Sequence, residues 1–157
     1  MTNSKEAISK AAIKDSYHNI KAVKKLIYET LINDSILTGL VPASNIFQSF
    51  PATTQINHPA IFYNIISDQL YPYNENDLNS KFSEVTFGIE IVDDSSNSVA
   101  SDDIQHRVFQ LFNGKILKNA DVIFKQACKR SYYFQYFDSE IKIWRTVTRY
   151  QTVTAPV

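Results

Sequence analysis

The sequence predicts an α+β fold, a two-layer sandwich in which a mostly antiparallel β-sheet packs against two main helices in the order α-β-β-α-β-β. Three features indicate it: apolar residues recur at helical spacing in two segments, they alternate with polar residues in others, and long extended runs close the chain. With 157 residues, of which 44% are hydrophobic and 13% aromatic, the chain has the bulk for one core. We therefore expect a single domain over residues 1–157.

The first helix is predicted between Lys5 and about Asn33. Its apolar residues lie three or four positions apart, with lysines between them, and are Ile20, Val23, Ile27 and Leu31. Ser16 can cap a helix that starts there. Residues 1–15 are therefore either the beginning of this helix or a separate N-terminal helical arm on an α+β core of residues 16–157. The sequence leaves both readings open.

A reversal follows this helix. Asn33, Asp34 and Ser35 predict a cap for one short apolar turn. Gly39 and Pro42 would end that turn, because glycine permits and proline enforces an exit from helical geometry.

Two strands are predicted in the middle of the chain. Residues 60–67 are rich in Ile, Phe and Tyr, whereas the polar residues 71–77, which include Tyr71 and Tyr73, predict a loop. Residues 82–92 alternate cleanly, and the apolar side chains that share one face are Val85, Phe87, Ile89 and Ile91. This alternation makes 82–92 the clearest strand of the sequence.

The second helix is predicted after the turn and capping residues 93–98. Its apolar residues at helical spacing are Ile104, Val108, Leu111 and Phe112. Asn113 and Gly114 would end it. Asp102 and Asp103 fall in its first turn, where the helix dipole favours acidic side chains.

Extended segments close the chain at residues 122–129, 131–137 and, after a turn at Asp138 and Ser139, 141–153. In the last run, one face carries Trp144, Thr146, Thr148, Tyr150 and Thr152, and the other carries Arg145, Val147, Arg149 and Gln151. We expect the apolar stripes of both helices to cover one face of the sheet, so that the other face meets solvent or a partner.

Composition excludes several classes of function. Sixteen basic and sixteen acidic residues leave no net charge, which disfavours general binding to DNA or to an anionic membrane. Three glycines cannot form either of the common phosphate-binding loops. The polar residues 1–10 lack the apolar segment of a signal peptide, and no run is long enough to span a membrane. We therefore expect synthesis in the cytoplasm and no membrane partner.

No catalytic residue, metal site or cofactor site is predicted. The three histidines have no metal-ligand spacing, and Cys128 has neither a second cysteine nor a nearby histidine. We interpret Cys128 as a small buried hydrophobe. The acidic pairs at 93–94 and 102–103 flank a helix start, where capping accounts for them. The chain is thus predicted not to be an enzyme.

Aromatic and charged residues interleave in residues 129–137. The candidate interface residues are Tyr132, Tyr133, Tyr136, Arg145 and Arg149, which we expect on the sheet face away from the helices, together with Tyr71 and Tyr73 in the loop at 71–77. This composition has three readings: a protein interface, in which Tyr and Arg are enriched, a strand packed on both faces, or a surface that stacks nucleic-acid bases. We rank them in that order.

The order of the predicted elements along the chain also matches the pattern of a known protein family. A first helix ends in a short apolar turn with Gly39, Val41 and Pro42, and a strand begins at Pro59-Ala60-Ile61-Phe62-Tyr63. The strand at 82–92 precedes a helix ending at Asn113-Gly114, and the closing strand carries Trp144-Arg145. Over residues 20–153 the chain resembles the tail-completion, or tail-terminator, proteins of tailed bacteriophages, in pattern and length.

The resemblance implies a structural virion protein of the tail or neck. Such a protein forms a hexameric ring that caps the finished tail tube and joins it to the head-side connector, with DNA only as cargo passing through. The implied partners are further copies of the same chain, the tail tube protein and the head–tail connector protein; no catalytic residue and no cofactor come with it. Loops at 48–58 and 71–77 would reach the tube or connector, and residues 1–15 are an addition to the family pattern.

A ring requires a heterologous interface, in which one patch meets a different patch on the next copy. A strand edge such as that of residues 141–153 could supply it through backbone hydrogen bonds. Two alternatives remain open: a head–tail connector or stopper, and a small module that binds single-stranded nucleic acid through residues 132–137. Salt-dependent binding of single-stranded DNA would favour the second alternative.

Overall fold

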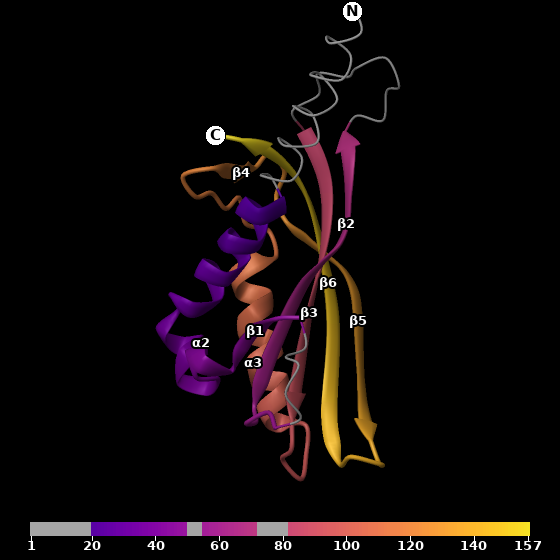
Figure 1. Cartoon of the computed structure of the whole chain (residues 1–157). Coiled ribbons are helices and arrows are strands. Elements are labelled where there is room, and N and C mark those ends of the chain that lie inside the picture. The colour runs from indigo at the N-terminus through magenta and orange to yellow at the C-terminus, as the bar shows by residue number, and fades with distance from the viewer. Residues whose placement is uncertain (1–19, 50–54, 72–81) are drawn as a thin grey trace, which may run out of the picture.

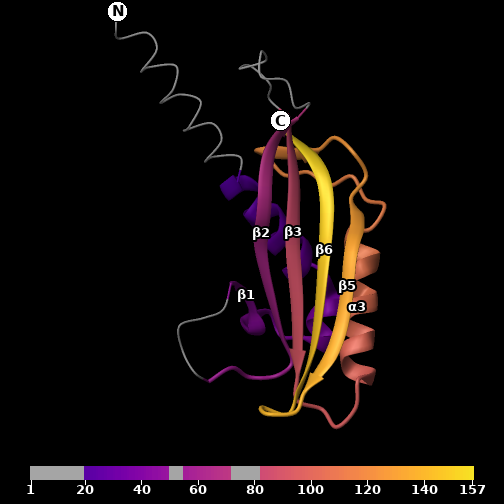
Figure 2. The same cartoon turned by 90° about the vertical axis from the view of Figure 1, so that its right-hand side faces the viewer.

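The computed structural model describes residues 20–49, 55–71 and 82–157, which form a sheet with helices on one of its faces (Figure 1). In the view turned by 90°, the other face of the sheet lies toward the viewer, and the described helices lie behind the sheet (Figure 2). The predicted α+β class, a two-layer sandwich with a mostly antiparallel sheet, is confirmed.

Within the described residues the sheet has six strands, which are β1 (Ile46–Gln48), β2 (Ala60–Tyr71), β3 (Phe82–Asp93), β4 (Val122–Phe124), β5 (Lys129–Asp138) and β6 (Ile143–Pro156). Their order is β1-β2-β3-β6, and the far side of β6 is shared by β5, along residues 143–151, and by β4, along residues 154–156. Of the strand pairs in the described part of the chain, β1–β2 alone is parallel. The three long strands β2, β3 and β6 therefore form the middle of the sheet.

The helical layer consists of a first helix, described over residues 20–32, then α2 (Ser35–Leu40), the 3₁₀ turn η1 (Ala43–Asn45) and α3 (Val99–Phe112). The predicted apolar stripes face the sheet: Val23, Ile27 and Leu31 of the first helix are fully buried. In α3, Ile104, Val108 and Phe112 are also buried. Gly114, just after α3, has a positive φ of 77°, a conformation that favours glycine and ends the helix.

The core lies between these helices and the facing side of the sheet. Strand β3 supplies its centre, because Val85, Phe87, Ile89 and Ile91 alternate with outward residues and are at most 1% exposed. The ring centroid of Phe87 lies 5.3 Å from that of Phe112 on α3 and 5.5 Å from that of Tyr150 on β6. Helix, central strand and closing strand thus meet at one aromatic cluster.

Several sequence expectations are corrected at element ends. The extended run expected at 122–129 is a strand only over β4, and Gly39 lies inside α2, which ends at Leu40 before Val41. Residues 141–153 were expected to supply a free strand edge, but they lie largely in β6. Strand β6 pairs with β3 on one side and with β5 and β4 on the other. The edge that sequence reasoning assigned to this run belongs instead to β5.

Three expectations lie outside the described residues. They are the arm at residues 1–15, the cap at Ser16 and the loop at 72–77, whereas Tyr71 is the last residue of β2. The division into an arm and a core stays a prediction.

Asp34 joins the first two helical segments to α3. Its carboxylate caps α2 by accepting a hydrogen bond from Leu37 N at 2.7 Å, and it accepts a second one from Arg107 Nε at 2.8 Å. Substitution Asp34→Ala removes the cap and leaves Arg107 without its carboxylate partner. We expect the free energy of unfolding at neutral pH to fall by about 1 kcal/mol from the loss of the cap alone, measured by chemical denaturation.

This contribution depends on pH. The hydrogen bond from Arg107 holds the pKa of Asp34 below its ordinary value. A carboxylate with a lowered pKa stabilises the fold above its unfolded pKa of about 3.9, and the contribution is lost as pH falls through the folded pKa. The difference between the parent protein and Asp34→Ala should therefore shrink below about pH 4. Glu140→Ala, in an exposed turn, is the control, and equal unfolding midpoints for the two variants would contradict the role of Asp34.

Candidate assembly surface

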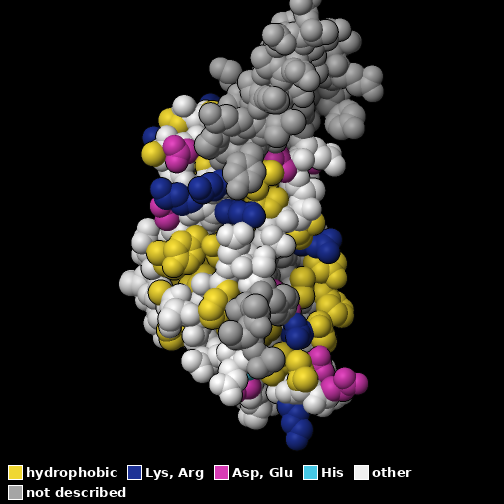
Figure 3. All heavy atoms as spheres, in the orientation of Figure 1, with side chains coloured by type: hydrophobic (Ala, Val, Ile, Leu, Met, Phe, Trp, Pro, Cys, Tyr) yellow, Lys and Arg dark blue, Asp and Glu magenta, His cyan; other side chains and the backbone are white. Residues whose placement is uncertain are grey.

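Strand β5 exposes all five of its aromatic side chains. They are between 38% and 51% exposed and comprise Tyr132, Tyr133, Phe134, Tyr136 and Phe137. The strand forms because these residues have high β propensity and because the turn after Asp138 returns the chain along β6. In Figure 3, hydrophobic side chains gather along the right-hand side of the molecule, where β5 lies in Figure 1. A large exposed apolar patch on a strand is typical of an interaction surface.

The outer face of this edge, turned away from the helices, brings four predicted residues together. Tyr132 is opposite Arg149, and Tyr136 is opposite Arg145, in the antiparallel β5–β6 register. The guanidinium carbon of Arg149 lies 4.9 Å from the Tyr132 ring centroid, within the range of a cation–π contact. The structure therefore places Tyr132, Tyr136, Arg145 and Arg149 on one face, as the sequence predicted.

Two further residues of this face were missing from the sequence-based set. Phe134 lies between the two tyrosines, with its ring centroid 5.4 Å from that of Tyr136. Glu90 on β3 accepts a hydrogen bond from Arg145 Nη1 at 2.7 Å, and both side chains are about one-fifth exposed. Strand alternation would have identified Phe134, since it is two positions from each tyrosine, but Glu90 required the pairing of β3 with β6.

Tyr133 does not belong to this face. It is opposite Thr148, a buried residue of the helix-facing side, so the expectation that it shares a face with Tyr132 is wrong. Neighbouring residues in a strand point to opposite faces. The guanidinium of Arg130 lies 4.5 Å from the Phe109 ring centroid of α3 and 5.2 Å from that of Tyr133. Tyr133 therefore lies at the border between α3 and the exposed edge.

The other two predicted residues are apart from β5. Tyr71 ends β2, where its backbone pairs with Phe82, and Tyr73 lies outside the described residues. Within one copy of the chain, β2 and β5 are separated by β3 and β6.

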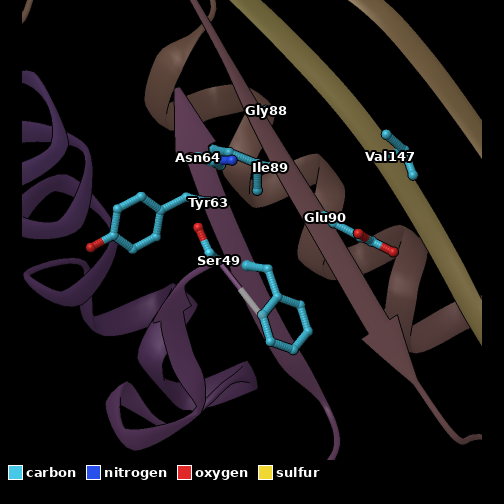
Figure 4. A pocket seen from close by; sticks show the side chains of 8 residues that line it. Ser49, Tyr63, Asn64, Gly88, Ile89, Glu90 and Val147 are labelled. Atoms are coloured by element: carbon cyan, nitrogen blue, oxygen red, sulfur yellow. The ribbon is translucent and has the colours of Figure 1, made fainter. Parts of the chain in front are cut away.

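A shallow hollow of about 190 Å³ lies beside this surface (Figure 4). Gly88 forms part of its lining, where a β-carbon would lie 3.0 Å from Ile66 Cδ1, so any side chain there would displace Ile66. The side chain of Tyr63 points toward the helices in Figure 4, away from Glu90 and Val147. The carboxylate of the hollow, Glu90, is ion-paired with Arg145. The hollow is a recess in the sheet surface next to the aromatic strand.

Cys128 and the two described histidines lie in different parts of the fold. Cys128 is 1% exposed, and burial raises the pKa of its thiol to about 12, which makes it a poor nucleophile. His58 Nδ1 lies 3.7 Å from Asp94, and His106 contacts Gln110. Within residues 20–49, 55–71 and 82–157, no group of His, Cys, Asp and Glu side chains is arranged to hold a metal ion.

Helix length bears on membrane insertion. None of the helices in the described part of the chain is both long enough and apolar enough to cross a bilayer.

The comparisons with known proteins concern the fold. Neither a protein-family model nor a curated protein sequence matches the chain. The structure is similar to a chain in the virion of a native gene transfer agent particle, with a TM-score of 0.69 and 11% identity, over 86% of this chain and 96% of that chain. A second solved chain matches with a TM-score of 0.55 and 8% identity, over 87% of this chain and 94% of its own length. The two-layer α+β fold is thus shared with both proteins over nearly their whole length.

Proposed function

We propose that the protein is a structural virion component, a tail terminator that forms a ring, caps the tail tube and joins it to the head-side connector. The observation that carries the proposal is the aromatic edge strand β5, whose side chains remain exposed in the single chain.

Physical chemistry supports an assembly role for β5. Tyrosine, phenylalanine and arginine are enriched at protein interfaces, and the aromatic side chains contribute large contact areas with few rotatable bonds. The outer face combines Tyr132, Phe134 and Tyr136 with Arg149, and Arg145 is already neutralised by Glu90. An interface can therefore bury this face without burying an unpaired Arg145 charge.

The fold likeness supports the virion context. A chain in the virion of a gene transfer agent particle has this fold over 96% of its own length. A chain of this fold is therefore a component of at least one virion. The order of elements along residues 20–153, which resembles tail-terminator proteins, supports the more specific role at the end of the tail tube. In such a ring the neighbouring copies present two different patches to each other.

The proposal is tested on the full-length chain. Mass photometry over a range of concentrations, alone and with the tail tube protein of the same virus, should show a discrete oligomer, and electron microscopy should show annular particles. A strict monomer under all of these conditions contradicts the ring.

A second arm of the same experiment separates the alternatives. A salt-dependent mobility shift of single-stranded DNA by a monomeric protein would support the nucleic-acid module instead, since phosphate contacts release counterions. Annular particles that bind the connector but not the tube would support the head–tail connector or stopper.

A further inference from the structure

We propose that β5 of one copy pairs as an antiparallel strand with residues 64–69 of β2 in the next copy, so that the sheet continues from subunit to subunit. This inference rests on the ring proposal and specifies the surfaces that form it.

Among the described residues, the sheet has an open edge at each side. On one side, β5 pairs along its length with β6 and has no second strand partner among the described residues. On the other side, β1 covers only residues 61–63 of β2, and within the described part of the chain residues 64–69 pair with β3 alone. Figure 2 shows β2 and β5 flanking β3 and β6. Unpaired backbone donors and acceptors on such edges are the usual template for strand addition.

Strand direction makes the two edges compatible. Because each of the pairs β2–β3, β3–β6 and β6–β5 is antiparallel, β5 runs opposite to β2. Rotation about an axis along the strands preserves the direction of every strand in each copy. The β2 of the next copy would therefore lie antiparallel to β5, and the alternation of the sheet would continue across the interface.

The helical layer would continue with the sheet. The first helix lies over β2, where the Tyr28 and Tyr63 ring centroids are 6.1 Å apart. At the other edge, α3 is tied to β5 by a hydrogen bond of 2.8 Å from Gln135 Nε2 to Asp102. Pairing β5 with β2 of the next copy brings that copy's first helix beside α3, where it would cover the helix-facing aromatic side chains of β5.

Pairing of β5 with β5 of a second copy is the competing arrangement. It would also be antiparallel, but a two-fold axis closes the assembly at two copies and leaves both β2 edges open. Pairing of β5 with β2 uses both open edges of every copy, and rotation then closes a ring.

Cysteine cross-linking tests the pairing in the full-length protein. One set of chains carries a single new cysteine on the outer face of β5, at Tyr132→Cys, Phe134→Cys or Tyr136→Cys; the other carries one on the outer face of β2, at Asn64→Cys, Ser67→Cys or Gln69→Cys. Mixing one chain of each set under mild oxidation should give covalent dimers. The linked pairs should follow antiparallel order. A cysteine near residue 136 of β5 should link best to one near residue 64 of β2, and a cysteine near residue 132 to one near residue 69.

The buried Cys128 should stay reduced in every variant, and the parent protein is the control for this. A matched control is Ile116→Cys, an exposed position between α3 and β4 that should not link to β2. Covalent dimers formed by a single β5 variant without its β2 partner would overturn the proposal in favour of β5–β5 pairing. A discrete oligomer without links between β5 and β2 would overturn this inference and leave the ring standing, whereas a strict monomer would overturn both.

Discussion

Substitution Phe87→Ala should lower the free energy of unfolding by about 3–5 kcal/mol, the range for removing a buried phenylalanine ring. Phe87 is fully buried at the centre of β3, and its ring contacts those of Phe112, Phe124 and Tyr150. Because the aromatic cluster joins the two layers, the cavity would weaken helix–sheet packing as well as the sheet. Urea or guanidinium denaturation followed by circular dichroism measures the change.

The matched control is Phe134→Ala on β5. The residue type and the type of element are the same, but the ring is 51% exposed, so the expected loss in the monomer is under about 1 kcal/mol. If Phe87→Ala does not fold, Ile89→Val, also fully buried in β3, should cost about 0.5–1.5 kcal/mol. Similar losses for Phe87→Ala and Phe134→Ala would contradict the assignment of the core to the helix-facing side of the sheet.

Substitution Phe134→Glu should prevent assembly while leaving the monomer folded. Phe134 lies at the middle of the exposed face of β5, between Tyr132 and Tyr136, and an interface there would bury the new carboxylate. Loss of a central aromatic residue typically costs about 2 kcal/mol or more in binding. Since about 1.4 kcal/mol corresponds to a tenfold change in affinity, the concentration needed for assembly should rise by more than tenfold, as measured by mass photometry.

Ile116→Glu provides the comparison for this substitution. Ile116 is 63% exposed in the segment between α3 and β4, so the same charge is introduced at an apolar surface position outside strand β5. Circular dichroism should be unchanged in both variants. Assembly of Phe134→Glu at the same concentration as Ile116→Glu would exclude the outer face of β5 as the interface.

The elements of the fold were largely predictable because their signals are local. The alternation in residues 82–92 appears in β3 as alternating burial, and the apolar stripes of the two helices are the buried residues of the first helix and α3. The cap at Asp34 and the end of α3 at Asn113 and Gly114 also follow from neighbouring residues. Such patterns need no knowledge of distant contacts.

The candidate surface was predicted only in part. Tyr132, Tyr136, Arg145 and Arg149 share a face because alternation within β5 and β6 and the turn between them are local properties. Tyr133 was assigned to the wrong face, and the strand has an irregularity between Arg130 and Tyr132 that shifts its register against β6. Glu90 could not be found, because its ion pair with Arg145 joins residues far apart in the sequence.

By itself the sequence determined where most of the helices and strands lie, most of their apolar faces, and that aromatic residues concentrate in 129–137. The tertiary structure decided that β6, rather than β5, lies inside the sheet, so that these aromatic residues stand at an edge. The reason is physical: periodicity reports the environment of one segment, whereas strand order depends on pairings between segments as distant as β3 and β6.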